Sequence, residues 1–254
     1  MTKKIFLLLI FCKISQATEL SVASIDWCPQ VCANSNMAGY ITDTAEMVFK
    51  DSPYKLNIQT YPWSRSIKLV EFGEKHALLS PAKKEAPSLI FPRNEIGIQR
   101  MCFFKLASSS WEFNGLESLK GLRIGIASHT SIEELSDYAD KNRHQFHYMP
   151  YHKNYIEQSL KKLKLNRLDT FLFTYNSTVF EMKEKGVFSN YKAAGCVSQA
   201  KVYLAFSPHP DLNTGPMISY FDKRMDELRA TDAISNILKK YDLNDWQEYS
   251  NKSN

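Results

Sequence analysis

Apolar residues along this chain of 254 residues alternate between two spacings. A period of two indicates strands, whereas repeats at i, i+3 and i+4 indicate helices. Short apolar or alternating runs predict strands over Leu20–Ile25, Leu56–Tyr61, Ala77–Leu79, Leu89–Phe91, Leu122–Ala127, Phe146–Tyr148 and Asp169–Phe173. Because helical patterns separate most of these runs, we expect βαβ units, largely parallel sheets and an α/β fold class.

Helical spacing follows most of the predicted strands. Helices are expected over Gly39–Phe49, from Trp63 through Val70, from Ser131, over Ile156–Leu163, and over Thr178–Lys185 before Gly186. The last predicted element is one long amphipathic helix, whose apolar face is formed by Phe221, Met225, Leu228, Ile234, Leu238 and Tyr241.

The first seventeen residues have the layout of a secretory signal peptide. Lys3 and Lys4 form a basic start, Ile5–Cys12 is an unbroken apolar run, and Ser15-Gln16-Ala17 offers small residues to signal peptidase. The apolar run is too short to span a bilayer, which needs about 20 apolar residues. We therefore predict export to the periplasm with cleavage after Ala17. The alternative is a buried first strand.

Charge and length are consistent with an exported α/β protein and add little to that prediction. The net charge is +5, and loss of the signal peptide lowers it to +2 because Lys3, Lys4 and Lys13 are removed with no acidic residue. The 237 residues that remain are enough for one large or two small cores. Basic clusters interleaved with aromatic residues, which would indicate nucleic-acid binding, are absent from the sequence. We expect a soluble monomer that binds no nucleic acid.

Four cysteines follow the predicted cleavage site: Cys28, Cys32, Cys102 and Cys196. An even number in an exported chain favours disulfides, although four cysteines allow three pairings. The spacing from Cys28 to Cys32 lacks the second pair that a zinc knuckle requires. We predict a local Cys28–Cys32 disulfide and a long-range Cys102–Cys196 disulfide, with four buried thiols as the alternative.

Six motifs in one order carry a resemblance to a known family. They are Asp26-Trp27 with Pro29, Gly39-Tyr40-Ile41-Thr42-Asp43, Tyr61-Pro62-Trp63-Ser64-Arg65, Ser118–Ile126, Asn166-Arg167-Leu168-Asp169 and Phe221–Trp246. On these motifs the mature chain resembles, over essentially its whole length, extracellular solute-binding protein family 3 of polar amino-acid type ABC importers.

The resemblance implies a type II periplasmic-binding fold, in which two Rossmann-like α/β lobes are joined by two crossing strands. The crossings would fall near Gly97–Met101 and Ala200–Tyr203. Residues 18–99 and 202–254 would then form the first lobe, and residues 100–201 the second. Cys102 and Cys196 would lie on neighbouring strands just beyond the hinge, which agrees with their predicted pairing.

A cleft between such lobes would recognise a small ligand by stacking faces and a few polar groups. The resemblance places Trp27 where the family has a cleft aromatic, and Tyr61 and Trp63 end a strand at the edge where open α/β sheets bind ligands. Core packing is the alternative role of these aromatic residues. The candidate ligand contacts are Trp27, Tyr61, Trp63, Arg65, Lys83, Thr130, Ser131, Thr174 and Tyr175.

The polar candidates also have two possible roles each. Arg65 can grip a carboxylate with two hydrogen bonds, or it can tie the two ends of the chain together. Thr130 and Ser131 open a predicted helix, where hydroxyls and free amides can bind an anion, or they can simply cap that helix.

Two positions depart from the family members that bind α-amino acids. Those members have an arginine in the turn after the third strand, where this chain has Ser80-Pro81-Ala82-Lys83-Lys84-Glu85. They also have an aspartate for the ligand's amino group, where this chain has Thr174. Both halves of the clamp for a zwitterion differ, so we expect a small polar ligand that is an amino acid or a related compound.

His144, His147 and His152 match no rigid pair of metal ligands, and we interpret them as a solvated surface cluster with a metal site as the alternative. We expect no cofactor and no catalytic residues. The function implied by the resemblance is a periplasmic solute-binding protein that serves an ABC permease or a membrane sensor. The alternative is a secreted enzyme on the same scaffold, such as a dehydratase, which would need an acid–base pair in the cleft.

Overall fold

The structure of the protein is a computed structural model that describes residues 17–33, 36–128, 135–150 and 154–246. Residues 1–16 of the predicted signal peptide and the candidates Thr130, Ser131 and His152 lie outside the described residues. Eight strands form one mixed sheet in the order β2-β1-β3-β8-β4-β7-β5-β6. The strands are β1 (Thr18–Ser24), β2 (Tyr54–Thr60), β3 (Ala77–Ala82), β4 (Gly97–Leu106), β5 (Ile124–Ala127), β6 (Phe146–Met149), β7 (Thr170–Thr174) and β8 (Tyr191–Phe206).

The helices follow the alternation that the sequence predicts. They are α1 (Tyr40–Phe49), α2 (Trp63–Glu71), α3 (Ser136–Lys141), α4 (Tyr155–Lys164), α5 (Tyr175–Glu184), α6 (Gly215–Arg229) and α7 (Ala233–Lys240), with short 3-10 turns at Leu116–Leu119, Arg143–Gln145 and Phe188–Asn190.

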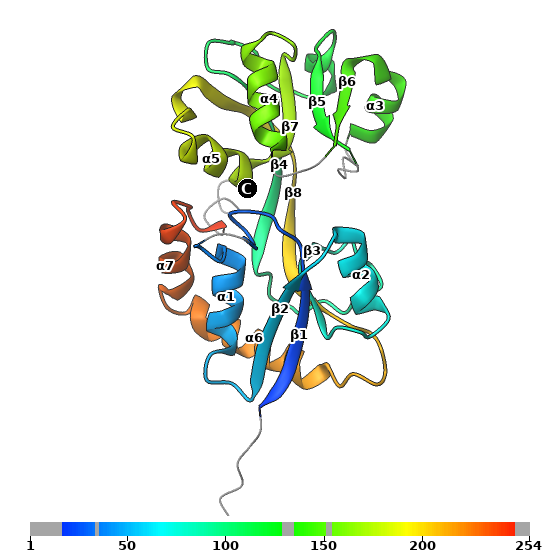
Figure 1. Ribbon diagram of the computed structural model, residues 1–254, viewed down its shortest axis with the longest axis vertical. Helices are drawn as coiled ribbons and strands as arrows, with labels where there is room; N and C mark the ends of the chain where they lie inside the picture. The colour runs from blue at the N-terminus through cyan, green and yellow to red at the C-terminus, as the bar shows by residue number, and fades with distance from the viewer. Residues whose placement is uncertain (1–16, 34–35, 129–134, 151–153, 247–254) are drawn as a thin grey trace, which may run out of the picture.

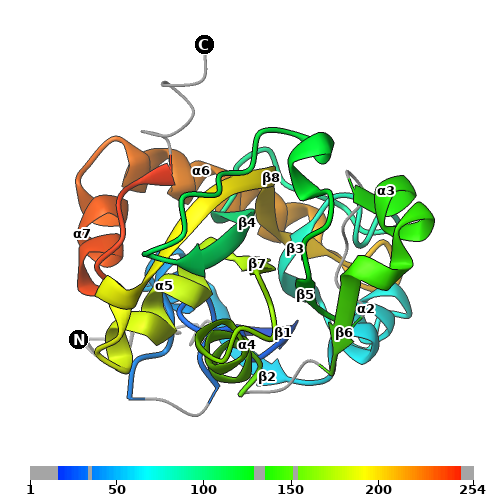
Figure 2. The same cartoon turned by 90° about the horizontal axis from the view of Figure 1, so that it is seen from above.

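Two strands, β4 and β8, pass from one lobe to the other, and the other elements gather in two lobes around their ends (Figure 1). The first lobe contains β1–β3 with α1, α2, α6 and α7, and the second contains β5–β7 with α3, α4 and α5 (Figures 1 and 2). The strands β4 and β8 pair antiparallel, with Gly97 opposite Val202 and Cys102 opposite Cys196. The predicted fold class, two α/β lobes joined by two strands, is confirmed.

Each lobe buries apolar side chains on both faces of its part of the sheet. Because successive strand residues point to opposite faces, Val22 packs with α1, α6 and α7 while its neighbour Ala23 packs beneath α2. In the second lobe, Phe171 faces α4 and α5, and Leu172 lies in the cluster that contains α3. Burial on both faces explains why these strands read as almost continuous apolar runs.

The turn that leads into α1 requires glycine at position 39. Gly39 has a φ of 101°, and a Cβ there would lie 2.5 Å from the carbonyl oxygen of Gln30. The amides of Tyr40 and Ile41 donate to the carbonyls of Pro29 and Gln30. The loop after β1 is therefore fixed on the first turn of α1, which positions Trp27.

The prediction of one long C-terminal helix is wrong, because α6 ends at Arg229 and α7 begins at Ala233. The hydroxyl of Thr231 donates to the carbonyl of Leu228 over 3.0 Å, and the amide of Ala233 donates to the same hydroxyl over 3.3 Å. These local side-chain hydrogen bonds compete with the helix and satisfy backbone groups where it stops.

The strand predicted over Leu89–Phe91 is also wrong, because only Ile90 forms an isolated bridge, with Phe206. Pro87 and Pro92 flank the segment, and proline lacks the N–H that a ladder needs. The helix predicted from Thr178 starts earlier, at Tyr175, directly after β7.

Both predicted disulfides are present. Cys28 and Cys32 are joined within the loop after β1, with their Cα atoms 4.7 Å apart. Cys102 and Cys196 join β4 to β8, with their Cα atoms 3.8 Å apart.

We predict that the two disulfides differ in their effect on stability. The Cys102–Cys196 bond spans 94 residues of sequence, so its loss in the variant Cys102→Ala/Cys196→Ala should lower the free energy of unfolding by about 4 kcal/mol. Loss of Cys28–Cys32, which spans 4 residues, should cost about 2 kcal/mol. Urea unfolding of both double variants measures the difference, and equal losses would contradict the prediction.

A histidine links β1 to the start of β3. The backbone amide of Ser21 donates to Nδ1 of His76 over 3.2 Å, and the Ser21 hydroxyl lies 2.7 Å from the same nitrogen. Burial lowers the pKa of His76, Lys75 adds to the lowering, and Glu19 opposes it. Since Nδ1 accepts a hydrogen bond from an amide, the folded protein favours the neutral imidazole.

We predict that His76 makes stability depend on pH. A pKa below the unfolded value of about 6.5 means that the contribution of His76 is complete above that pH and is lost as the pH falls towards the folded pKa. The free energy of unfolding should therefore fall from pH 7.5 to pH 5, and His76→Gln should flatten this slope. Urea unfolding across that range provides the measurement. Parallel slopes for both proteins would show that His76 is not responsible.

Candidate functional site

The two lobes contact each other through the loop after β1 and the junction at which β7 passes into α5. The indole Nε1–H of Trp27 donates to Oγ1 of Thr174 over 3.3 Å. Beside this contact, Nε2 of Gln30 donates to the hydroxyl of Ser177, also over 3.3 Å. Open α/β sheets bind ligands outside the carboxyl ends of their strands. These two hydrogen bonds therefore join the lobes at the edges where a ligand site is expected.

Trp27 is held in a constrained loop. Its amide donates to the carbonyl of Val31 over 2.7 Å, and the carboxylate of Asp26 accepts the amide of Ala33 over 3.0 Å. The Cys28–Cys32 disulfide closes the same loop. The side chain is half-buried and does not join the apolar clusters of the described residues, so its indole contacts the second lobe instead of the first-lobe core.

Thr174 and Tyr175 lie where β7 passes directly into α5. Thr174 is 4% exposed, and its carbonyl accepts the hydroxyl of Thr178 over 2.9 Å. The Tyr175 ring lies 4.1 Å from the guanidinium carbon of Arg100, measured to the ring centroid, and stacks on Phe104 at 6.1 Å. Arg100, on the crossing strand β4, thus approaches the second-lobe side of the site, and the sequence did not single it out.

Tyr61, Trp63 and Arg65 lie together around the start of α2. The guanidinium carbon of Arg65 is 5.4 Å from the centroid of the Tyr61 ring. Trp63 is half-buried against the cluster that contains Ala23 and Leu78. This packing matches the alternative role of Trp63 in the core, and its contact with a ligand stays a prediction.

The end of β3 and the turn that follows it contain an exposed cation, Lys83, and a buried residue with strained backbone, Ser80. Lys83 is exposed, and its Nζ lies 5.2 Å from the centroid of the Tyr203 ring on β8. Ser80 has a φ of 69° and is 3% exposed. Its hydroxyl has no hydrogen-bond partner among the described residues. Backbone strain of this kind gathers at binding sites. A residue before proline ordinarily favours extended backbone with negative φ, so the Ser80-Pro81 step gives no sequence signal for this conformation.

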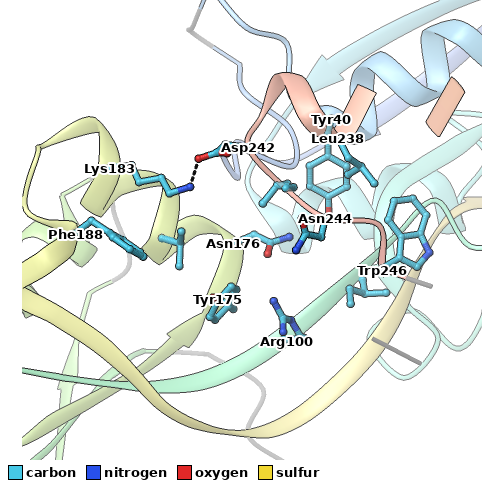
Figure 3. Close-up of a pocket in the computed structure, with 13 residues that line it drawn as sticks. Tyr40, Arg100, Tyr175, Asn176, Lys183, Phe188, Leu238, Asp242, Asn244 and Trp246 are labelled. Atoms are coloured by element: carbon cyan, nitrogen blue, oxygen red, sulfur yellow. Dashed lines mark hydrogen bonds and ion pairs between the residues drawn. The ribbon is translucent and has the colours of Figure 1, made fainter. Parts of the chain in front are cut away.

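A cavity of about 140 Å³ opens beside the crossing strands, between α5 and the segment that follows α7 (Figure 3). We call it the flank cavity. It is lined by Tyr40, Ile98, Arg100, Tyr175, Asn176, Val179, Lys183, Phe188, Leu238, Asp242, Leu243, Asn244 and Trp246. Of the described ligand candidates, Tyr175 alone is among them. Lys183 and Asp242 form an ion pair between the lobes at this cavity (Figure 3).

The described residues contain no group of three or more histidine, cysteine, aspartate or glutamate side chains arranged to hold a metal ion. His144 and His147 are exposed on the second lobe. Within the part of the chain that the structure describes, no helix has the length and apolar character to cross a membrane.

Comparison with known proteins supports the fold. No protein-family model matches the chain, and no curated protein matches its sequence. A probable amino-acid ABC transporter extracellular-binding protein, ytmK from Bacillus subtilis, has a TM-score of 0.69 and 19% identity, over 89% of this chain and 97% of that chain. A histidine kinase sensor domain with similarity to periplasmic binding proteins has a TM-score of 0.69 and 16% identity, over 89% of this chain and 97% of that chain.

A third structure, the ancestral amino acid-binding protein AncCDT-1, is a precursor of cyclohexadienyl dehydratase. It has a TM-score of 0.64 and 11% identity, over 88% of this chain and 94% of that chain. At these identities the likeness concerns the fold alone. The chain has the two-lobed fold of the periplasmic binding proteins.

We predict that Trp27 contributes little to stability. Trp27→Ala removes one neutral hydrogen bond and should cost about 1 kcal/mol. Trp246 is a matched control, because it is 3% exposed in the first-lobe core, and Trp246→Ala should cost about 3–5 kcal/mol. Urea unfolding of both variants provides the comparison. A loss at Trp27 as large as that at Trp246 would place Trp27 in the core.

Proposed function

We propose that this protein is an exported solute-binding protein that holds one small polar molecule between its two lobes. The observation that carries the proposal is the hydrogen bond between Trp27 and Thr174, which lie 147 residues apart and come from opposite lobes. Together they supply an aromatic face and a polar group at the carboxyl edges of the sheet, which is the combination that small-ligand sites use.

The proposed site comprises the nine candidates from the sequence: Trp27, Tyr61, Trp63, Arg65, Lys83, Thr130, Ser131, Thr174 and Tyr175. In the proposal the lobes divide at the crossing strands, with residues 18–99 and 202–254 on one side and residues 100–201 on the other. Separation of the lobes about the crossing strands would admit the ligand, and their contact would enclose it.

The proposed ligand is an amino acid or a related compound with an anionic group. Structures of similar fold include a probable amino-acid binding protein. Arg65 and Lys83 provide positive charge on the first lobe, whereas Thr174 provides a neutral hydroxyl where amino-acid binders of the resembled family have a carboxylate. The ligand's carboxylate is therefore a stronger basis for recognition than an ammonium group.

The proposed partner is a membrane protein that recognises the ligand-bound arrangement of the lobes. One structure of similar fold is a probable amino-acid ABC transporter extracellular-binding protein and another is a histidine kinase sensor domain, so an ABC permease and a membrane sensor are both proposed partners. We place the mature protein in the periplasm as a monomer, after cleavage following Ala17. Two disulfides support export, because such bonds persist in oxidising compartments.

The second candidate function is a secreted enzyme of the dehydratase type. Its support is the similar fold of AncCDT-1, a precursor of cyclohexadienyl dehydratase. Consumption of a bound compound, measured by chromatography after incubation with the protein, separates the enzyme from the binding protein.

We predict that a ligand will raise the melting temperature. The purified mature protein is screened against amino acids, polyamines, organic acids and oligopeptides. A ligand at 100 times its dissociation constant adds about 2.7 kcal/mol to the free energy of unfolding, which corresponds to roughly 5–10 °C for a protein of this size. If no class of compound shifts the transition, the proposal is wrong.

The same screen tests the proposed site. Trp27→Ala should weaken binding of the compound at least tenfold. Stacking on the ligand contributes about 0.5–1.5 kcal/mol to the binding free energy, in addition to the contribution from the apolar area that the indole buries. Lys164→Ala is a suitable control, since Lys164 is exposed at the end of α4 and away from the proposed site. Unchanged affinity in Trp27→Ala would remove Trp27 from the site.

A further inference from the structure

The end of the second lobe that points away from the first lobe is a surface that the proposed function does not use (Figure 1). The parallel strands β5, β6 and β7 begin there in register, because Ile124 pairs with both Phe146 and Thr170. Helix α4 ends at the same place, at the top of the molecule in Figure 1. The proposed cleft lies at the other end of these strands, where β7 passes into α5 at Tyr175.

Basic side chains gather at this end of the second lobe. They include Lys141, Arg143, Lys161 and Arg167, which are exposed and form no ion pair among the residues that the structure describes. We call these four residues the basic tip. The neighbouring acids Glu117 and Asp169 are already paired, with Lys120 and Arg123 respectively. Asp140 is exposed beside the tip and offsets one of its charges, so the surface stays positive.

Hydrogen bonds hold the two halves of the basic tip next to each other across the start of β5. On one side, Nη2 of Arg123 donates to Oδ1 of Asn166 over 2.8 Å, which fixes the turn after α4. On the other side, Nε2 of Gln145 donates to the carbonyl of Leu119 over 2.8 Å, which fixes the turn before β6. The four charges therefore belong to one fixed surface.

Two exposed leucines lie among these charges. Leu165, in the turn after α4, is 50% exposed, and its amide donates to the carbonyl of Lys161 over 3.0 Å. Leu116, in the 3-10 turn that leads towards β5, is 41% exposed. An acidic protein surface would be met by charge alone. Apolar side chains that project between basic ones suit the boundary between lipid headgroups and acyl chains.

We infer that the basic tip docks the protein on a membrane surface that contains anionic lipids. Lys141, Arg143, Lys161 and Arg167 attract the lipid phosphates, and Leu116 and Leu165 enter the headgroup region. An exported protein held in this way stays close to a partner in the membrane. The inference uses the proposed export, but it needs neither the proposed ligand nor the proposed cleft, so vesicle binding and the ligand screen can fail independently.

Vesicles provide the probe. The purified mature protein is sedimented with vesicles of phosphatidylcholine alone or with about 30% phosphatidylglycerol, and the anionic vesicles should bind it at least tenfold more strongly. Raising the salt concentration from about 0.05 M to about 0.5 M should release it, because the screening length shortens. Equal binding to both kinds of vesicle, binding that salt does not weaken, or no binding to either would overturn the inference.

A pair of charge variants locates the surface. Lys161→Gln/Arg167→Gln should weaken binding to the anionic vesicles at least tenfold. Lys55→Gln/Lys239→Gln is the matched control, because it removes the same charge from exposed positions on the first lobe. An equal loss in the two variants would overturn the inference, since net charge and not the basic tip would then be responsible.

A third variant tests the apolar part of the contact. Leu165→Ser leaves every charge in place, so it should weaken binding several-fold and keep the dependence on salt. Because Leu165 is half exposed, the fold should tolerate the change. Unchanged binding in Leu165→Ser would overturn the proposed insertion of this turn into the headgroup region.

Discussion

The backbone ladder between β4 and β8 is the interaction on which the rest of the structure depends. It runs from Gly97 opposite Val202 to Leu106 opposite Tyr191, with register shifts after Met101 and Phe103. Because both strands carry the chain from lobe to lobe, this ladder fixes the distance between the two lobes. Register shifts of this kind bend a strand and increase its twist. The bend therefore falls where the strands enter the second lobe, next to the Cys102–Cys196 disulfide.

Contacts between the lobes outside this ladder are individually weak. The Trp27–Thr174 and Gln30–Ser177 bonds are neutral, and each is worth about 0.5–1.5 kcal/mol. The Lys183–Asp242 pair adds about 0–1 kcal/mol, because Lys183 is 37% and Asp242 is 79% exposed. These energies are comparable with the differential affinity of an ordinary ligand for two conformations. A molecule bound between the lobes can therefore control whether they are in contact, as the proposed function requires.

The sequence predicts most of the fold, because local patterns determine it. The alternation of Leu122, Ile124 and Ile126 marks a strand without any knowledge of its neighbours, and the expected crossing strands agree with the predicted Cys102–Cys196 pairing. Prediction fails where local chemistry is subtle. Thr231 ends α6 with two hydrogen bonds of its hydroxyl, and nothing in the apolar spacing of the predicted helix shows this.

The candidate site is predicted less completely than the fold, for a physical reason. Trp27 and Thr174 were both singled out as separate candidates, but their direct contact depends on how the two lobes approach each other. Gln30 and Ser177 form a second hydrogen bond between the lobes, although they are 147 residues apart in the sequence. Neither residue has a local sequence pattern that distinguishes it from an ordinary surface residue. Such contacts between segments distant in sequence arise only when the whole sheet is assembled, so local sequence patterns do not predict them.

Position 174 connects this geometry to the chemistry of the proposed ligand. Thr174 is 4% exposed, and its hydroxyl accepts the indole N–H of Trp27. A carboxylate at this depth would need a cationic partner to offset its desolvation, whereas a hydroxyl needs only a hydrogen bond. Two cations lie against aromatic rings, Arg100 over Tyr175 and Lys83 near Tyr203. With a neutral hydroxyl at position 174 and cations at Lys83 after β3 and Arg100 on β4, the proposed cleft is better suited to the anionic end of a solute than to its ammonium end.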